Sequence, residues 1–225
     1  MILACDTSSE ICSVAVAHNG EILFQKATSG PQIHIEKLSV FLQEAIEMQD
    51  TFPAKIDSLA VAIGPGSFNG LRIGLATMKA LALSLELPLI PIKTTDALAF
   101  GLRDKKLGRG RAVIFSHRNF VHFADYELNP DLLPQADEFS YDSWDQLNEA
   151  GVDFYFGQAE RGFADWLKTE DGAPINNAFH LTNSDASHVA LLAEKLKGQD
   201  IPDLDVLEPF YNARYEAKKW VPPKF

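Results

Sequence analysis

Cysteine is scarce in this chain of 225 residues, which contains only Cys5 and Cys12. Two thiols cannot supply the disulfide framework of a small secreted protein or a metal site made of cysteines alone. If residues 2–17 form a hairpin, the two cysteines could lie opposite each other. We expect a pair of reduced, buried thiols, as is usual in a cytosolic protein.

Long hydrophobic runs are also missing. The opening MILACDTSSE has neither the basic start nor the apolar core of a signal peptide. The apolar stretch at residues 81–92 is interrupted by Glu86 and Pro88, and it is much shorter than the roughly 20 residues of a membrane span. The sequence therefore predicts a cytoplasmic protein without a membrane segment.

Positive charge is the third deficit. Lysine and arginine number 20 against 31 aspartates and glutamates, a net charge of −11. Because nucleic-acid backbones bind through lysine and arginine, such a chain should contact RNA only indirectly. Its share of hydrophobic residues, 46%, is that of an ordinary globular protein, and its length suits one large or two small domains.

Periodicity predicts an α/β domain over residues 1–102. A buried strand at residues 2–6 precedes a hairpin whose turn is Asn19 and Gly20, a pair that supplies the two positive φ angles of a type I′ turn. Apolar residues then alternate between helical and strand patterns. The expected order is βββαβαβα, with helices at 33–48, 71–85 and from 95, and strands at 57–63 and 87–94.

The second half is less regular. Residues 103–111 form a charged linker, and two short β runs around Arg118 and Asn119 echo the opening hairpin. This echo indicates a degenerate internal duplication. Residues 128–186 are rich in aspartate, proline, asparagine and glycine, and a helix is expected at 187–197. We therefore predict two domains, residues 1–102 and 103–225.

The most specific segment is GPGSFNGLRIG, residues 64–74. Gly64, Gly66 and Gly70 bend the chain from a buried strand into a helix that Ser67 or Asn69 can cap. The N-terminus of a helix favours an anion. However, the glycine spacing differs from the dinucleotide fingerprint, and no Gly-Lys-Ser/Thr follows. A phosphate site and a purely structural turn both remain open.

This segment resembles the signature GPGSFTG(L/V)RIG of the TsaB (YeaZ) family. The opening ILACDTSSEICSVAV is similar to the start of that family, and EPFYNAR at residues 208–214 resembles its EP-x-Y-L-R ending. The similarity covers about the first 100 residues without gaps and is loose beyond them. Asn69 stands where the family has threonine, and Ser116, His117 and Arg118 stand where it often has Asp-Ala-Arg.

The resemblance implies an actin/hexokinase-like (ASKHA) fold of two lobes with duplicated βββαβα units, the second truncated. It also implies a non-catalytic scaffold or activating subunit of the complex that transfers threonylcarbamoyl to a tRNA adenosine. The partner would be TsaD, in a heterodimer, with a TsaE-type ATPase in the complex and a homodimer as a further option. ATP and a metal would be used on TsaD, and no cofactor is expected on this chain.

Metal binding is not expected. The resemblance places the metal-binding histidines of TsaD at Thr94 and Leu98, and leucine has no donor atom. The six histidines contain no i, i+4 pair, and His34 is expected to be an ordinary surface or interface residue. The missing histidines also disfavour a stand-alone metalloprotease.

Asp6 ends the first strand, where ATPases of this superfamily carry an aspartate that positions magnesium. One hypothesis is a vestigial phosphate loop, and the other is that Asp6 bonds the amides of its own turn. The first reading keeps open a small-molecule kinase or ATPase. Its residues would be Asp6, Thr7, Ser8, Gly64, Gly66, Ser67, Asn69, Gly70 and Arg72. Arg72 would pair with Asp6 or with an acid of a partner, because a cation in the first helical turn opposes the helix dipole.

The helix at 71–85 is apolar nearly all round, which is typical of a helix buried on most faces. We expect it to form the partner interface together with the helix at 33–48, although both could instead pack entirely within the monomer. The expected interface residues are Ile35, Leu38, Phe41, Leu42, Ala45, Gly70, Leu71, Gly74, Leu75 and Met78. The basic, aromatic residues 218–225 are either a further partner or RNA contact or a solvated terminus.

Overall fold

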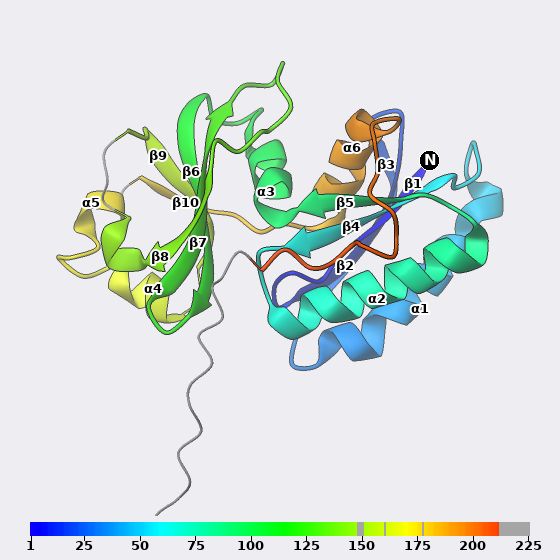
Figure 1. Ribbon diagram of the computed structural model, residues 1–225, viewed down its shortest axis with the longest axis horizontal. Helices are drawn as coiled ribbons and strands as arrows, with labels where there is room; N and C mark the ends of the chain where they lie inside the picture. The colour runs from blue at the N-terminus through cyan, green and yellow to red at the C-terminus, as the bar shows by residue number, and fades with distance from the viewer. Residues whose placement is uncertain (148–150, 160, 177, 212–225) are drawn as a thin grey trace, which may run out of the picture.

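The computed structural model describes residues 1–147, 151–159, 161–176 and 178–211, which form two lobes side by side (Figure 1). The predicted contacts of residues 218–225 lie outside the described residues. Each lobe contains a five-stranded mixed sheet. In the described part of the chain, no helix has both the length and the apolar character needed to cross a membrane.

The first sheet has the strand order β3-β2-β1-β4-β5. Its strands are β1 (Ile2–Asp6), β2 (Ile11–His18), β3 (Glu21–Ser29), β4 (Ser58–Gly64) and β5 (Leu89–Lys93). The first three are antiparallel, and β4 and β5 run parallel to β1. Asn19 and Gly20 have φ angles of 53° and 83°, so the predicted hairpin turn is confirmed.

The two cysteines are free and buried, but they do not face each other. Cys5 lies opposite Val14, and Cys12 lies opposite Thr28 on β3. The suggestion that they could be opposite is wrong because the turn after β1 pairs Asp6 with Ser13, which displaces the cysteines by two positions.

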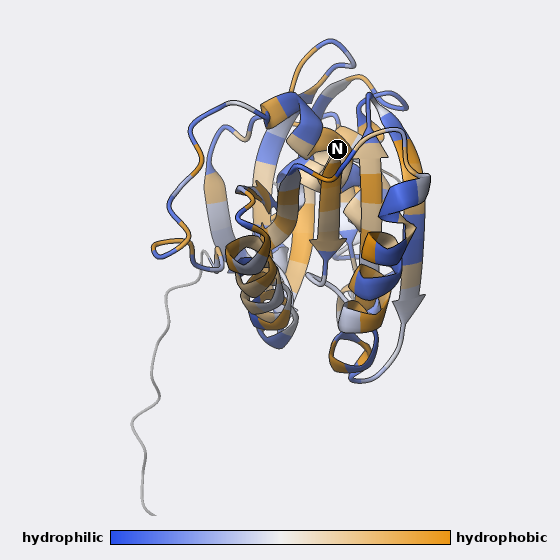
Figure 2. Ribbon diagram, turned by 90° about the vertical axis from the view of Figure 1, so that its right-hand side faces the viewer, coloured by the Kyte–Doolittle hydropathy of each residue, from blue (hydrophilic) through white to orange (hydrophobic). Residues whose placement is uncertain are grey.

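Helices cover both faces of the first sheet. On one face lie α1 (Ile33–Glu47), which continues into the short η1 (Met48–Thr51), and α2 (Phe68–Leu85). Their core with the sheet is aliphatic and includes Leu38, Leu75 and Leu59. In Figure 2, hydrophobic residues are concentrated on the central strands.

The second sheet repeats the topology of the first, with the order β10-β9-β6-β7-β8. Its strands are β6 (Gly108–His117), β7 (Phe120–Leu128), β8 (Phe139–Ser143), β9 (Phe154–Gln158) and β10 (Phe179–Leu181). β6 pairs antiparallel with β7 and parallel with β9, as β1 does with β2 and β4. The predicted duplication is confirmed. The helical elements between these strands are short: η2 (Trp144–Gln146), α4 (Arg161–Trp166) and α5 (Ala173–Asn176).

The joint between the lobes contains α3 (Thr94–Leu102). Leu98, Ala99 and Leu102 pack with residues of the second sheet. The buried Tyr126 of β7 donates a hydrogen bond to Asp96 (2.6 Å). Burial raises the pKa of Asp96. This contact therefore holds the N-terminal turn of α3 against the second lobe.

The domain boundary at residue 102 requires two corrections. The predicted linker at 103–111 already contains the start of β6, at Gly108. The second correction concerns α6 (Ala186–Leu196), which was assigned to the second domain but packs on the first sheet through Val189, Ala190 and Ala193. Burial decides its place, because the face of the first sheet opposite α1 and α2 needs an apolar cover.

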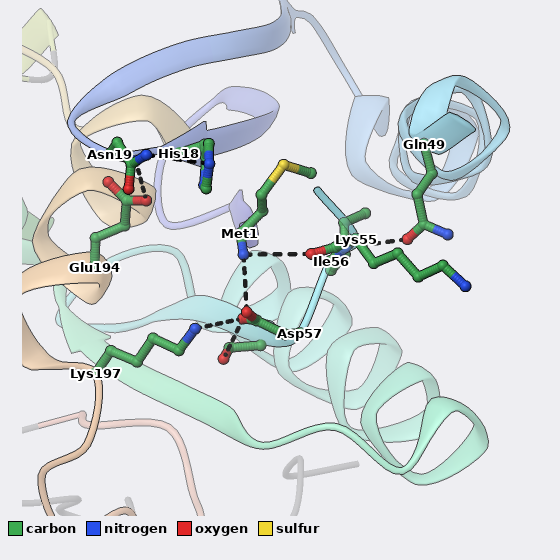
Figure 3. Close-up of polar contacts among 10 residues, drawn as sticks. Met1, His18, Asn19, Gln49, Lys55, Ile56, Asp57, Glu194 and Lys197 are labelled. Carbon is green, nitrogen blue, oxygen red and sulfur yellow. Dashed lines mark hydrogen bonds and ion pairs between the residues drawn. The ribbon is translucent and has the colours of Figure 1, made fainter. Parts of the chain in front are cut away.

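Polar contacts at the C-terminal end of α6 fasten it to the first lobe (Figure 3). Glu194 accepts hydrogen bonds from the backbone amides of Asn19 and Gly20 (3.0 and 2.9 Å). Lys197 pairs with Asp57 (2.7 Å), which also pairs with the amino group of Met1 (3.1 Å). α6 is therefore connected to the turn of the first hairpin and to the residue preceding β4.

Candidate functional site

The glycine loop packs directly on the turn that follows β1. The amide of Ser67 donates to the carbonyl of Ser8 (2.7 Å). A Cβ atom at Gly66 would lie 2.2 Å from that oxygen, and one at Gly70 would lie 2.0 Å from the carbonyl oxygen of Thr7. Glycine is required at both positions because the two backbones are in contact. At the same time, Ser67 caps α2 by accepting a hydrogen bond from the Gly70 amide (3.3 Å).

Asp6 is buried beneath this loop, with 1% of its surface exposed. One carboxylate oxygen accepts a hydrogen bond from the amide of Ser8 (2.8 Å), and the other accepts one from the hydroxyl of Ser184, which precedes α6. Burial raises the pKa of Asp6, although these hydrogen bonds oppose the shift. The interpretation that Asp6 bonds its own turn is therefore confirmed, and Ser184 is a partner that the sequence did not suggest.

Most residues of the hypothetical phosphate loop thus come together in space, but the polar groups between the loop and the turn face one another. The hydroxyl of Thr7 donates to the carbonyl of Gly70 (2.8 Å), and Gly74 also packs against the Thr7 side chain. A phosphate between the loop and the turn would require these contacts to separate. The arrangement therefore favours the structural reading of GPGSFNG.

Arg72 does not pair with Asp6, so the first of its two predicted partners is wrong, and pairing with an acid of a partner stays a prediction. Its Nε donates to the hydroxyl of Tyr211 (2.9 Å), and its guanidinium lies 3.9 Å from the ring centre of Phe68. The reason is that α2 begins at Phe68, three residues before the predicted start. Arg72 consequently lies beyond the first turn on the exposed surface, while Asp6 is buried. Tyr211 was not singled out, although it lies within the EPFYNAR segment.

Thr94 and Leu98, which correspond to the metal-binding positions implied by the resemblance, are both fully buried. Across the described ranges, no group of three or more histidine, cysteine, aspartate or glutamate residues is arranged to hold a metal ion. His34 is half-buried, and its Nε2 lies 2.9 Å from the carbonyl oxygen of Ser9. The ring therefore links the start of α1 to the turn after β1.

Most of the predicted interface residues belong instead to the core of the first lobe, and this is the main correction at residue level. The stripe at i, i+3 and i+4 spacing points toward the sheet, so most of it cannot also meet a partner. Ile35, which is 69% exposed, and the half-buried Phe41 remain accessible, and the largely buried Leu42 reaches the groove described next. The buried residues are Leu38, Leu42, Ala45, Gly70, Leu71, Gly74, Leu75 and Met78.

The outward side of the same two helices nevertheless forms an apolar groove of about 470 Å³. Ile46 of α1 and Leu81 of α2 form its sides, and the exposed Ala80 lies along it. The lining consists of Ser39, Leu42, Gln43, Ile46, Glu47, Thr77, Ala80, Leu81 and Ser84. The predicted pair of helices therefore offers a docking surface, made mostly of residues that the sequence did not single out.

Comparisons with known proteins agree with this fold. Residues 28–145, slightly more than half of the chain, match the family described as TsaD: tRNA N6-adenosine threonylcarbamoyltransferase. The Escherichia coli tRNA threonylcarbamoyladenosine biosynthesis protein TsaB is 35% identical over 138 residues, covering 61% of this chain and 59% of that protein. The Pediococcus pentosaceus tRNA N6-adenosine threonylcarbamoyltransferase is 31% identical over 108 residues, covering 41% of this chain and 31% of that protein.

The structure of YeaZ from Pseudomonas aeruginosa superposes with a TM-score of 0.76 at 21% identity, covering 93% of this chain and 98% of that one. This similarity concerns the fold, and it confirms the predicted actin/hexokinase-like architecture. The chain belongs to the family described as TsaD: tRNA N6-adenosine threonylcarbamoyltransferase, and within it to the TsaB (YeaZ) proteins.

Proposed function

We propose that this chain takes part in the biosynthesis of threonylcarbamoyladenosine in tRNA as a non-catalytic subunit that docks a TsaD-type transferase. The names of the curated relatives supply the pathway. The match to the E. coli relative covers 59% of that protein, so the partner and the role are inferred from the surface of this chain.

The observation that carries the proposal is the apolar groove between α1 and α2. A groove between two helices accepts the side-chain ridge of another helix. A TsaD-type chain belongs to the same family and fold, so it can present a comparable helix pair, and the two pairs would form a four-helix contact. Ile35 and Leu83, exposed to 69% and 67%, extend the apolar character of these two helices beyond the groove.

The packing around Asp6 supports a role without chemistry on this chain. The carboxylate is occupied by Ser8 and Ser184, and the glycine loop is pressed onto the adjacent turn. ATP and metal would then be handled by TsaD and by a TsaE-type ATPase. With a net charge of −11, this chain would meet the tRNA only through its partners.

The docking surface can be tested with Ala80→Arg, which places a charged side chain in the groove. Since Ala80 is exposed, the variant should fold normally yet bind TsaD roughly a hundredfold more weakly, because a buried unpaired charge at an interface costs about 3 kcal/mol or more. Calorimetry and threonylcarbamoylation of tRNA by the reconstituted complex would measure the effect. The matched control is Ala27→Arg, the same change at an exposed position on β3.

Normal TsaD binding by Ala80→Arg would refute the assigned surface. If light scattering showed only a loss of self-association with TsaD binding intact, the groove would join two copies of this chain instead. The kinase or ATPase alternative has its own test. ATP turnover by the purified chain that disappears on Asp6→Asn would replace the non-catalytic role.

A further inference from the structure

The described residues cover only part of the outer face of the second sheet. In the first lobe this position is occupied by the long helices α1 and α2, whereas η2, α4 and α5 cover just the part of the second sheet around Val113 and Val121. Beside them lies an open pocket of about 470 Å³. It is lined by Arg109, Arg111, Phe123, Ala124, Asp125, Asp137, Glu138, Ser140, Tyr141, Asp142 and Gln146.

The pocket has an excess of negative charge. Arg111 makes two hydrogen bonds to Asp125 (2.6 and 2.9 Å), and Arg109 pairs with Asp137 (2.6 Å). Two arginines are thus matched by two aspartates, while Glu138 and Asp142 add two further acids at the exposed rim. The ring of Phe123 lies on this outer face, whereas the ring of Tyr141 packs against His122 on the opposite face of the sheet. This combination suits a positively charged segment that carries aromatic side chains.

The C-terminal part of the chain leads to this region. The ring of Phe210 packs edge-on against Phe139, with 5.0 Å between centroids, and Lys93 lies over both rings. Phe139 is the first residue of β8, an edge strand, and its two chain neighbours, Glu138 and Ser140, line the pocket. The chain therefore passes the edge of the second sheet just before residue 212.

We propose that residues 212–225 dock in this second-lobe pocket of their own chain. The segment NARYEAKKWVPPKF carries four basic residues against the single acid Glu216, and it contains Trp220. At about 3.3 Å per residue, Lys218 can reach roughly 25 Å from Phe210. That length is ample to round one edge strand, because neighbouring strands lie about 5 Å apart and packed layers about 10 Å apart. Lysines would pair with the rim acids, and Trp220 would contact Phe123.

Tryptic cleavage of the full-length protein after Arg214, Lys218, Lys219 and Lys224, followed by mass spectrometry, tests this contact. Cleavage of a docked segment depends on the population of its released form. We expect it to be at least about fivefold slower than in a free peptide of residues 212–225. The triple variant Asp137→Asn, Glu138→Gln, Asp142→Asn should abolish the protection, and so should salt at about 0.5 M, which screens the charges.

The matched control is Asp165→Asn, Glu170→Gln, Asp171→Asn, which removes the same charge from exposed positions outside the pocket and should preserve the protection. Circular dichroism would verify that both variants are folded. Cleavage as fast as in the free peptide would overturn the proposal. So would protection that survives the pocket variant, which would place the segment elsewhere, or protection that rises with protein concentration, which would indicate docking between copies.

Discussion

The two sheets of this molecule have the same strand order, but the elements that pack on their outer faces differ. In the first lobe, α1 and α2 contribute an aliphatic layer that includes Leu38 and Leu75. In the second, short elements contribute aromatic rings, and Trp144 and Phe163 pack with centroids 5.8 Å apart. The pairing of strands is therefore duplicated, whereas the layer on top is not. A sheet can keep its hydrogen bonds under any apolar cover of sufficient size.

The difference in cover decides what each lobe offers to its surroundings. Long helices leave an apolar groove between them, with Ile46 and Leu81 at its sides. Short elements leave part of the sheet open, and that part is charged, with Arg111 and Asp125 among its lining. One lobe thus suits a helical partner, and the other suits a charged segment.

The largest effect on the free energy of unfolding is expected where α1 and α2 pack on the first sheet. Leu75 is 3% exposed, so Leu75→Asp would bury a charge among aliphatic side chains and lower the free energy of unfolding by about 4 kcal/mol or more. Ala80→Asp, five residues later on the outward side of α2, should change it by less than about 1 kcal/mol. Urea denaturation of both variants measures the contrast. An equal loss of stability in both variants would contradict the assignment of Leu75 to the buried side of α2 and Ala80 to its exposed side.

A smaller loss of stability is expected in the second sheet, at a point where strand pairing leaves no room for a side chain. Gly157 of β9 has a φ of +138°, and a Cβ there would lie 2.0 Å from the carbonyl oxygen of Val113. Gly157→Ala should cost about 3 kcal/mol, from backbone strain and displacement of β6. Gly198→Ala is the control, since Gly198 has a φ of +90° but open space around it, and it should cost about 1 kcal/mol. Thermal unfolding that ranks the two variants in the opposite order would contradict the close β6–β9 contact.

The smallest effect on stability is expected at Asp57, which connects the end of α6 to the first lobe. Burial alone would raise the pKa of Asp57, but hydrogen bonds from Lys197, the Met1 amino group and Ser58 outweigh it and lower that pKa to about 2. Because the folded pKa lies below the ordinary value of 3.8, the stabilisation is complete above about pH 4 and is lost as the pH falls toward 2.

Asp57→Asn should therefore lower the free energy of unfolding at pH 7 by less than about 1 kcal/mol, since Asp57 is half-exposed. The difference from the unmodified chain should vanish near pH 2. Denaturation curves recorded between these pH values provide the measurement. A difference that persists at pH 2 would show that the carboxylate charge is not the cause.

Local patterns predicted the strands and helices of the first lobe well, but they did not predict β8, β9, β10 or the short helices of the second lobe. The turn at Asn19 and Gly20, the helix beginning at Ile33 and the repeat of the hairpin around Arg118 all depend on neighbours in sequence, which turn chemistry and periodicity report directly. The glycine loop was also identifiable, because glycines at a strand-to-helix bend indicate close backbone contact. What the loop contacts was not identifiable, since Thr7 and Ser8 lie far away in sequence.

The sequence by itself determined the order of the elements in the first lobe, the echo of its hairpin in the second and the family to which the chain belongs. Only the tertiary structure decided which side of each helix is buried, that α6 covers the first sheet, and that Arg72 meets Tyr211 instead of Asp6. The physical reason is that α2 is apolar on nearly every side, so its periodicity cannot distinguish the core from an interface. That choice is made by packing between segments distant in sequence, which no local pattern records.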